Sequence, residues 1–190
     1  MDIRHFFFKY RSYTPIPLII VALVFARPTW TSFFSGLGIM LIGEWIRFRG
    51  VAYAGSATRT TEGAGGDRLV TSGPFAHVRN PLYLGNFFLS SGVLIMSWVW
   101  MPFMALFFIL LFALQYSLIV NLEEEYLAKR FGSEYEAYCS SVRRWIPRVT
   151  PYKGKEILSP NIKKALRSER NTFQSIAAVC ILILVRWHLL

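Results

Sequence analysis

The residues able to do chemistry are concentrated in two short segments of the chain. The first, residues 67–85 (DRLVTSGPFAHVRNPLYLG), mixes charged, aromatic and proline side chains with a histidine. The second begins with three consecutive glutamates at residues 123–125 and continues through a tyrosine-rich stretch to Pro147. Carboxylates accept hydrogen bonds, whereas arginine and histidine side chains donate them. Each segment therefore combines charged or polar groups with flat aromatic rings.

A further carboxylate, Glu44, lies inside an apolar stretch. Arg47 follows three positions later, so the two side chains can pair on one face of a helix. A carboxylate within a membrane-spanning segment is nevertheless a candidate site residue, here on the substrate side. Cys139 and Cys180 are far apart and lack the spacing of metal ligands, so we expect reduced cysteines and no metal site.

Long apolar stretches must position these segments. Hydrophobic residues make up 54% of the 190 residues, and the mean hydropathy is +0.38. A membrane-spanning helix needs about 20 apolar residues. The sequence predicts an all-α integral membrane bundle of about five transmembrane helices. The apolar stretches are residues 15–26, 30–48, 82–100, 101–120 and 174–190.

The distribution of positive charge predicts the orientation. The net charge is +10, and the basic residues cluster beside the apolar stretches, where they would meet anionic lipid head groups. That placement argues against nucleic acid as the partner. With a cytoplasmic N-terminus and five crossings, nineteen of the twenty-one Lys and Arg residues fall on the cytoplasmic side. We therefore expect a multi-pass protein with a cytoplasmic site, in the inner membrane if the source is bacterial.

Two segments remain between the apolar stretches on the cytoplasmic side. Residues 50–80, rich in Gly, Ser and Thr, are expected to form a structured loop. Residues 121–144 show helical spacing of apolar residues, with Gly132 separating two helices and Ser133 capping the second. Tyr135 and Tyr138 are interpreted as packing against the membrane surface. The whole chain is expected to be one domain, residues 1–190, with a motif-bearing core at 67–147 and a final transmembrane helix at 170–190.

Taken together, the two segments resemble the isoprenylcysteine carboxyl methyltransferase and phospholipid methyltransferase superfamily. Its members show a Leu-Val-x-x-Gly-x-Tyr and Arg-His-Pro-x-Tyr-x-Gly block, matched here by residues 69–75 (LVTSGPF) and 79–85 (RNPLYLG). A downstream Glu-Glu-x-x-Leu and Phe-Gly-x-x-Tyr-x-x-Tyr block is matched by residues 123–127 (EEEYL) and 131–138 (FGSEYEAY). Both blocks occur in order on either side of a predicted transmembrane hairpin.

The resemblance implies an S-adenosylmethionine-dependent methyltransferase acting on a lipophilic acceptor from the bilayer. The cofactor needs acceptors for its ammonium and ribose, donors for its carboxylate and a wall for its adenine. Glu44 and His77 are the candidate catalytic bases. The candidate cofactor-binding residues are Asp67, Arg68, Leu69, Val70, Phe75, Arg79, Asn80, Pro81, Leu82, Tyr83, Glu123 and Glu124.

Two positions depart from the pattern of the prenylcysteine enzymes. Asn80 replaces a histidine, so this side chain cannot titrate near neutrality. Ile119 occupies the position of an arginine that is suited to a substrate carboxylate. A lipid amine, a hydroxyl or another lipophilic acceptor is therefore favoured over a prenylcysteine carboxylate.

Two other functions are compatible with this pattern. Sterol reductases share the helical arrangement in their C-terminal half and bind a nicotinamide cofactor, but they carry more spans. A non-catalytic membrane protein that keeps the fold as a scaffold is the other alternative. Binding of S-adenosylhomocysteine, of NADPH or of neither separates the three.

Overall fold

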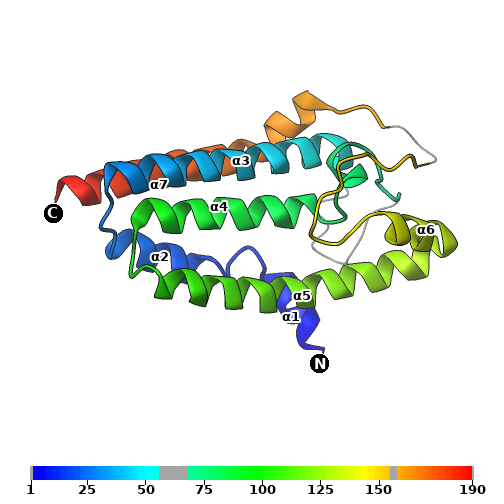
Figure 1. The fold of residues 1–190 in the computed structure, drawn as a ribbon, viewed down its shortest axis with the longest axis horizontal. Coiled ribbons are helices and arrows are strands. Elements are labelled where there is room, and N and C mark those ends of the chain that lie inside the picture. Colours follow the sequence, from blue (N-terminus) through cyan, green and yellow to red (C-terminus); the bar gives the residue numbers. More distant parts are fainter. Residues whose placement is uncertain (1, 56–67, 155–157, 190) are drawn as a thin grey trace.

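The computed structural model describes residues 2–55, 68–154 and 158–189, and these are helical, with no β-strand among them. The long helices run side by side along one axis (Figure 1). The helix α6 and the loops lie at one end of this bundle, and the C-terminus lies at the other. The helices are α1 (Ile3–Tyr10), α2 (Ile16–Val24), α3 (Trp30–Ala54), the 3₁₀ helix η2 (Gly73–Ala76), α4 (Pro81–Ser97), α5 (Phe103–Phe131), α6 (Ser133–Ser141) and α7 (Ile162–His188).

Glycines bring α3 and α4 into direct backbone contact. A Cβ atom added to Gly43 would lie 2.7 Å from the carbonyl oxygen of Gly85, and one added to Gly36 would lie 2.4 Å from the backbone nitrogen of Met96. A Cβ atom added to Gly92 of α4 would lie 2.6 Å from the carbonyl oxygen of Gly36 in α3. Small residues allow helices to approach closely in apolar surroundings, where dispersion contacts hold them together. The α3–α4 pair is therefore the most closely packed part of the fold.

Among the described residues, one helix, α5, is both long enough and apolar enough to span a membrane. Its 29 residues correspond to about 43 Å at 1.5 Å per residue, and large apolar side chains such as Phe103, Leu106 and Leu110 are exposed on it. The helix α4 is apolar but shorter, and the nine residues of α2 reach about 14 Å alone, against roughly 30 Å of hydrocarbon. Each expected apolar stretch coincides with a helix, but length and apolar composition together establish one crossing and not five.

Two local expectations were wrong. Residues 50–54 continue α3 and are not part of a loop. Ser133 does not cap α6, because Gly132 holds the capping position and no side chain there makes a cap hydrogen bond. Gly132 has φ 49°, a conformation that glycine adopts without strain, and it ends α5 and begins α6.

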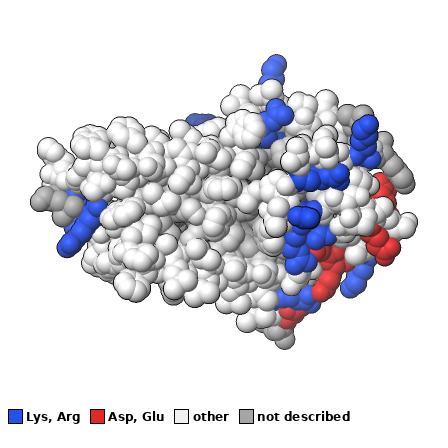
Figure 2. Space-filling model, viewed as in Figure 1, with Lys and Arg blue, Asp and Glu red and all other residues white. Residues whose placement is uncertain are grey.

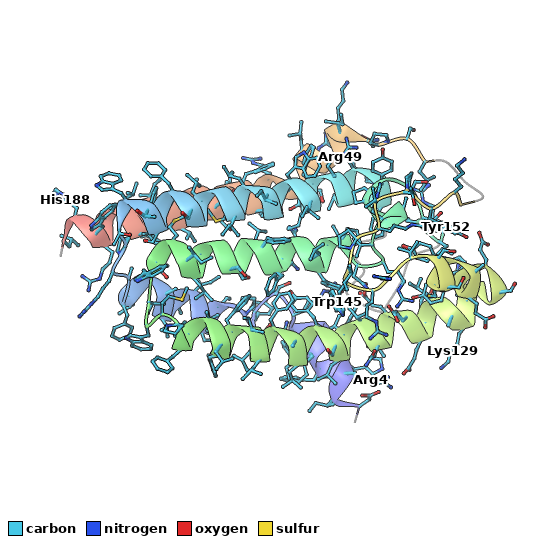
Figure 3. All side chains as sticks on the ribbon, in the orientation of Figure 1. Arg4, Arg49, Lys129, Trp145, Tyr152 and His188 are labelled. Atoms are coloured by element: carbon cyan, nitrogen blue, oxygen red, sulfur yellow. The ribbon has the colours of Figure 1, made fainter. Side chains whose placement is uncertain are left out.

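Charged side chains are concentrated at the end of the bundle that carries α6 and the loops. Figure 2 shows Lys, Arg, Asp and Glu gathered there, while the long middle of this face has almost no charge. Lys129, Trp145 and Tyr152 lie toward this end and His188 lies at the opposite one (Figure 3). The bundle thus has a charged end, which carries α6 and the loops, and a long apolar region of helices, which we call the shaft.

The glycine contact gives a matched pair of variants on one helix. Gly36→Ala forces a methyl group into the backbone of α4, whereas Gly38→Ala meets no atom within 4 Å. We expect Gly36→Ala to lower the free energy of unfolding by about 1–3 kcal/mol because the site has no room for the methyl group. Thermal unfolding in detergent should show a melting temperature several degrees lower for Gly36→Ala and unchanged or higher for Gly38→Ala. Equal melting temperatures would contradict the close α3–α4 packing.

Candidate active site

A cavity of about 720 Å³ lies where the loops meet the ends of α4 and α5. Eleven of the twelve cofactor-binding residues predicted from the sequence line it, although they come from two segments that are 40 positions apart. The twelfth, Asp67, lies outside the described residues. The eleven are Arg68, Leu69, Val70, Phe75, Arg79, Asn80, Pro81, Leu82, Tyr83, Glu123 and Glu124.

Glu123 and Tyr83 join α5 to the first turns of α4. The Tyr83 hydroxyl donates to Oε1 of Glu123 over 2.7 Å. Pro81 occupies the first turn of α4, and Asn80 makes no side-chain cap bond there. The Asn80 amide nitrogen donates to the Arg144 carbonyl at 3.3 Å. The N–H groups of this helix start are therefore uncapped beside the cavity, an arrangement that suits an anionic group.

Glu124 connects the two motif segments through charge. Its carboxylate lies 2.6 Å from Nη2 of Arg144 and 3.5 Å from Nη2 of Arg79. Burial lowers the pKa of Arg79, but the Glu124 carboxylate, together with Cys139 and Tyr135, raises it, and the net direction is upward. The Arg79 backbone N–H also donates to the carbonyl of Arg143. These contacts hold the loop before α4 against the segment after α6.

The aromatic residues of the second motif reach the cavity rather than a lipid-facing surface. Tyr135 and Tyr138 are buried and both line the cavity. The Tyr138 hydroxyl donates to the backbone carbonyl of Phe75 over 2.7 Å, and burial raises the pKa of this hydroxyl. The interpretation of the two tyrosines as surface packing is therefore wrong. Both instead line the cavity, and Tyr138 fixes the loop that carries Phe75.

The two residues predicted as catalytic bases do not line the cavity. One ring nitrogen of His77 lies 2.9 Å from the carbonyl oxygen of Arg148, and the backbone of Arg148 donates back to His77. Glu44 is buried, with Oε2 3.6 Å from Nε of Arg47. The structure therefore places His77 in a loop contact and Glu44 beside Arg47.

Sequence reasoning missed the polar residues at the inner end of the cavity. Arg47 lies 2.9 Å from a carboxylate oxygen of Glu169 on α7, and it also donates to Asn86. The Asn86 amide donates to the Tyr116 hydroxyl at 3.1 Å. Asn86 and Arg47 lie within apolar stretches of the sequence, where a polar side chain is costly and marks a candidate functional site. This position in the sequence was the signal that could have identified them. Nothing in the sequence pairs Arg47 with a residue 122 positions away.

A second, mostly apolar cavity of about 400 Å³ adjoins the first. It is lined mainly by residues of α2, α4, α5 and α7, with Met40 of α3, and it shares several lining residues with the larger cavity, among them Leu89, Ser90 and Tyr116. The larger cavity, which carries the charged side chains at the loop end of the bundle, is thus continued by a mostly apolar one between the helices.

Comparison with known proteins agrees with the motifs. The family described as phospholipid methyltransferase matches residues 31–134. Protein-S-isoprenylcysteine O-methyltransferase of Schizosaccharomyces pombe is 30% identical over 118 residues, 60% of this chain and 49% of the relative. Cobalt-zinc-cadmium resistance protein CzcN of Cupriavidus metallidurans is 30% identical over 102 residues, 53% of this chain and 45% of the relative. The chain spans about half the length of these curated relatives, and no solved structure matches it.

The contacts of Glu124 predict its effect on stability. Glu124→Gln leaves Arg79 and Arg144 without a charged partner, and we expect the free energy of unfolding to fall by about 1–3 kcal/mol. Glu136→Gln, on the exposed face of α6, is the matched control and should change it by less than about 0.5 kcal/mol. Denaturant unfolding monitored by tryptophan fluorescence measures both. The same small change in both variants would contradict a stabilising role for Glu124.

Proposed function

This chain belongs to the phospholipid methyltransferase family, and on that premise we propose that it transfers a methyl group from S-adenosylmethionine to a lipophilic acceptor in the membrane. The observation that carries the proposal is the convergence of both motif segments on one cavity of about 720 Å³. That volume is within the range of small-molecule and cofactor sites.

The side chains around this cavity match the chemical groups of S-adenosylmethionine. Glu123 offers an acceptor for an ammonium or a ribose hydroxyl, and Arg68 with the uncapped start of α4 offers donors for a carboxylate. Phe75 and Tyr83 offer aromatic surface for an adenine. When bound, the cofactor supplies a methyl group on a positively charged sulfur. The residues of the chain orient the reactants and exclude water.

The same proposal includes the placement in the membrane. The chain is a multi-pass protein whose N-terminus and loop end face the cytoplasm, in the inner membrane if the source is bacterial. Two features support this placement: nineteen of the twenty-one basic residues fall on the cytoplasmic side of the expected topology, and the charged end in Figure 2 is separated from an apolar shaft. Membrane lipids then surround the shaft.

The acceptor reaches the cavity from the bilayer side. The apolar cavity between α2, α4, α5 and α7 adjoins the larger one, so it can hold a hydrocarbon chain while the polar end of the acceptor lies near Tyr83 and Glu123. A base is required only if the reacting atom arrives protonated. His77 does not line either cavity, which argues against it as that base.

Glu123 and Glu125 form a matched pair for testing cofactor binding. Glu123 lines the cavity, whereas Glu125 lies on the exposed side of α5 and pairs with Arg4. Glu123→Gln should weaken the binding of S-adenosylhomocysteine by about ten- to a hundredfold, because a charged hydrogen-bond partner is lost. Glu125→Gln should leave the dissociation constant unchanged. Calorimetry that shows equal losses in both variants rules out this assignment of Glu123.

The acceptor class is tested in membranes incubated with methyl-labelled S-adenosylmethionine. We expect the label in the organic phase, because the acceptor is lipophilic. Free prenylcysteine should be a poor acceptor, since Ile119 replaces an arginine and is buried against Phe8 and Leu122, and an unpaired carboxylate is costly in a partly dry site. Label confined to water-soluble products, or efficient methylation of prenylcysteine, would show that this acceptor class is wrong.

A further inference from the structure

The first turns of α7 expose an apolar side and a basic side. Ile162, Leu166 and Phe173 are 54%, 52% and 39% exposed, and at about 100° per residue they lie within about 40° of one another around the helix. The exposed basic side chains of the same turns are those of Lys163, Lys164, Arg167 and Arg170. We call these apolar and basic residues together the α7 outer face.

The positive charge of the α7 outer face is not neutralised by neighbouring acidic groups. Glu169 is the one acidic residue of α7, and it is buried against Arg47 of α3. The helices α2, α3 and α4 pack on α7 and contain one acidic residue, Glu44, which is also buried. None of the four basic side chains forms an ion pair with a described residue. Figure 2 shows Lys and Arg at the top of the view, where α7 begins, and Asp and Glu only farther down and to the right.

The length of α7 places the outer face at the depth of lipid head groups. Trp30, Trp98 and Trp100 are exposed at the far end of the shaft, and the ring of Trp30 lies 4.6 Å from that of Trp187 on α7. Exposed tryptophans are typical of a membrane interface. A hydrocarbon layer of about 30 Å corresponds to about 20 helical residues. Counting about 20 residues back from Trp187 reaches Arg167, so the opposite interface falls within the α7 outer face.

The combination of basic and apolar side chains favours an anionic lipid as the partner. Lys163, Arg167 and Arg170 lie within about 60° of one another around the helix, so all three can approach one head-group region. Basic side chains near the membrane surface attract anionic lipids. Apolar side chains of an interfacial helix are buried at the boundary between head groups and acyl chains. A nucleic acid would engage the charge through its phosphates and leave the apolar side exposed to water.

We infer that the α7 outer face is a binding site for an anionic phospholipid of the cytoplasmic leaflet. Its basic side chains bind the head group, and its apolar side chains contact the acyl boundary. No residue of this face lines either cavity, so the lipid bound here is distinct from the methyl acceptor. The site also lies beyond residues 31–134, which match the family. The inference rests on the membrane placement within the proposed function and not on methyl transfer.

Lipid binding to the full chain in a neutral detergent tests this site. Native mass spectrometry counts bound dioctanoyl phosphatidylglycerol and dioctanoyl phosphatidylcholine, which differ in head group but not in chain length. The wild type should bind phosphatidylglycerol at least about tenfold more tightly, because only this lipid carries a net negative charge. The triple variant Lys163→Gln, Arg167→Gln and Arg170→Gln should lose that preference.

A second triple variant is the matched control. Lys9→Gln, Lys129→Gln and Lys153→Gln remove the same charge from exposed positions on other segments, so the preference should persist. Loss of the preference in both triple variants would show that overall charge selects the lipid, and this overturns the inference. Equal affinity of the wild type for the two lipids overturns it even if the α7 variant does not fold. A preference that persists in the folded α7 variant overturns it as well.

Competition identifies the partner of the α7 outer face. At constant ionic strength, neither inorganic phosphate nor a single-stranded oligonucleotide should displace phosphatidylglycerol, because neither covers the apolar side. Displacement by the oligonucleotide would indicate a nucleic-acid site, and displacement by phosphate would indicate a site for free anions; each overturns the inference. S-Adenosylhomocysteine binding is measured on the same samples. Its absence would contradict the proposed function and leave the result for the lipid standing.

Discussion

The backbone contact between α3 and α4 determines where the functional groups of this protein lie. Gly43 and Gly85 let the two helices touch, and the absence of a side chain at Gly85 leaves room for the Arg47 side chain, since an added Cβ would lie 2.5 Å from its Cγ. Arg47 can therefore run along α4 to Asn86 and reach Glu169. A larger residue at either glycine would separate the helices or displace Arg47. Close packing of two apolar helices is thus the condition for the buried polar network.

The charged groups around the larger cavity form two sets, one near the loop end and one deeper in the bundle. Near the loop end, Glu124 pairs with two arginines. Deeper in the bundle, two carboxylates surround Arg47. Coulombic energies are larger in less polar surroundings. The excess of carboxylates around Arg47 therefore has a larger effect on energy than the same excess at the surface. The charged and polar side chains of the larger cavity thus lie at two levels, and the mostly apolar cavity adjoins the inner one.

The sequence predicted the helices well and their ends poorly. Apolar stretches located the α3, α4 and α5 helices, and the helical spacing of residues 121–144 with its break at Gly132 predicted that α5 continues to Phe131 and that α6 follows. The end of α3 at Ala54 was missed. The motif residues around the larger cavity were predicted through the resemblance to a family. The network of Arg47, Asn86, Tyr116 and Glu169 was not, because periodicity reports one helix face and cannot pair Arg47 with Glu169. Glu44 was predicted as a candidate base that can also pair with Arg47, and the structure places its Oε2 3.6 Å from Nε of Arg47.

Equilibrium binding to the purified, full-length chain tests the central claim most directly. The chain in nanodiscs is titrated by calorimetry with S-adenosylhomocysteine and, separately, with NADPH. A methyltransferase site in the larger cavity predicts saturable one-to-one binding of S-adenosylhomocysteine and no binding of NADPH. Binding of NADPH in its place would instead favour a membrane reductase, and binding of neither ligand would favour a scaffold that has kept the fold. Either result would contradict the proposed methyltransferase function.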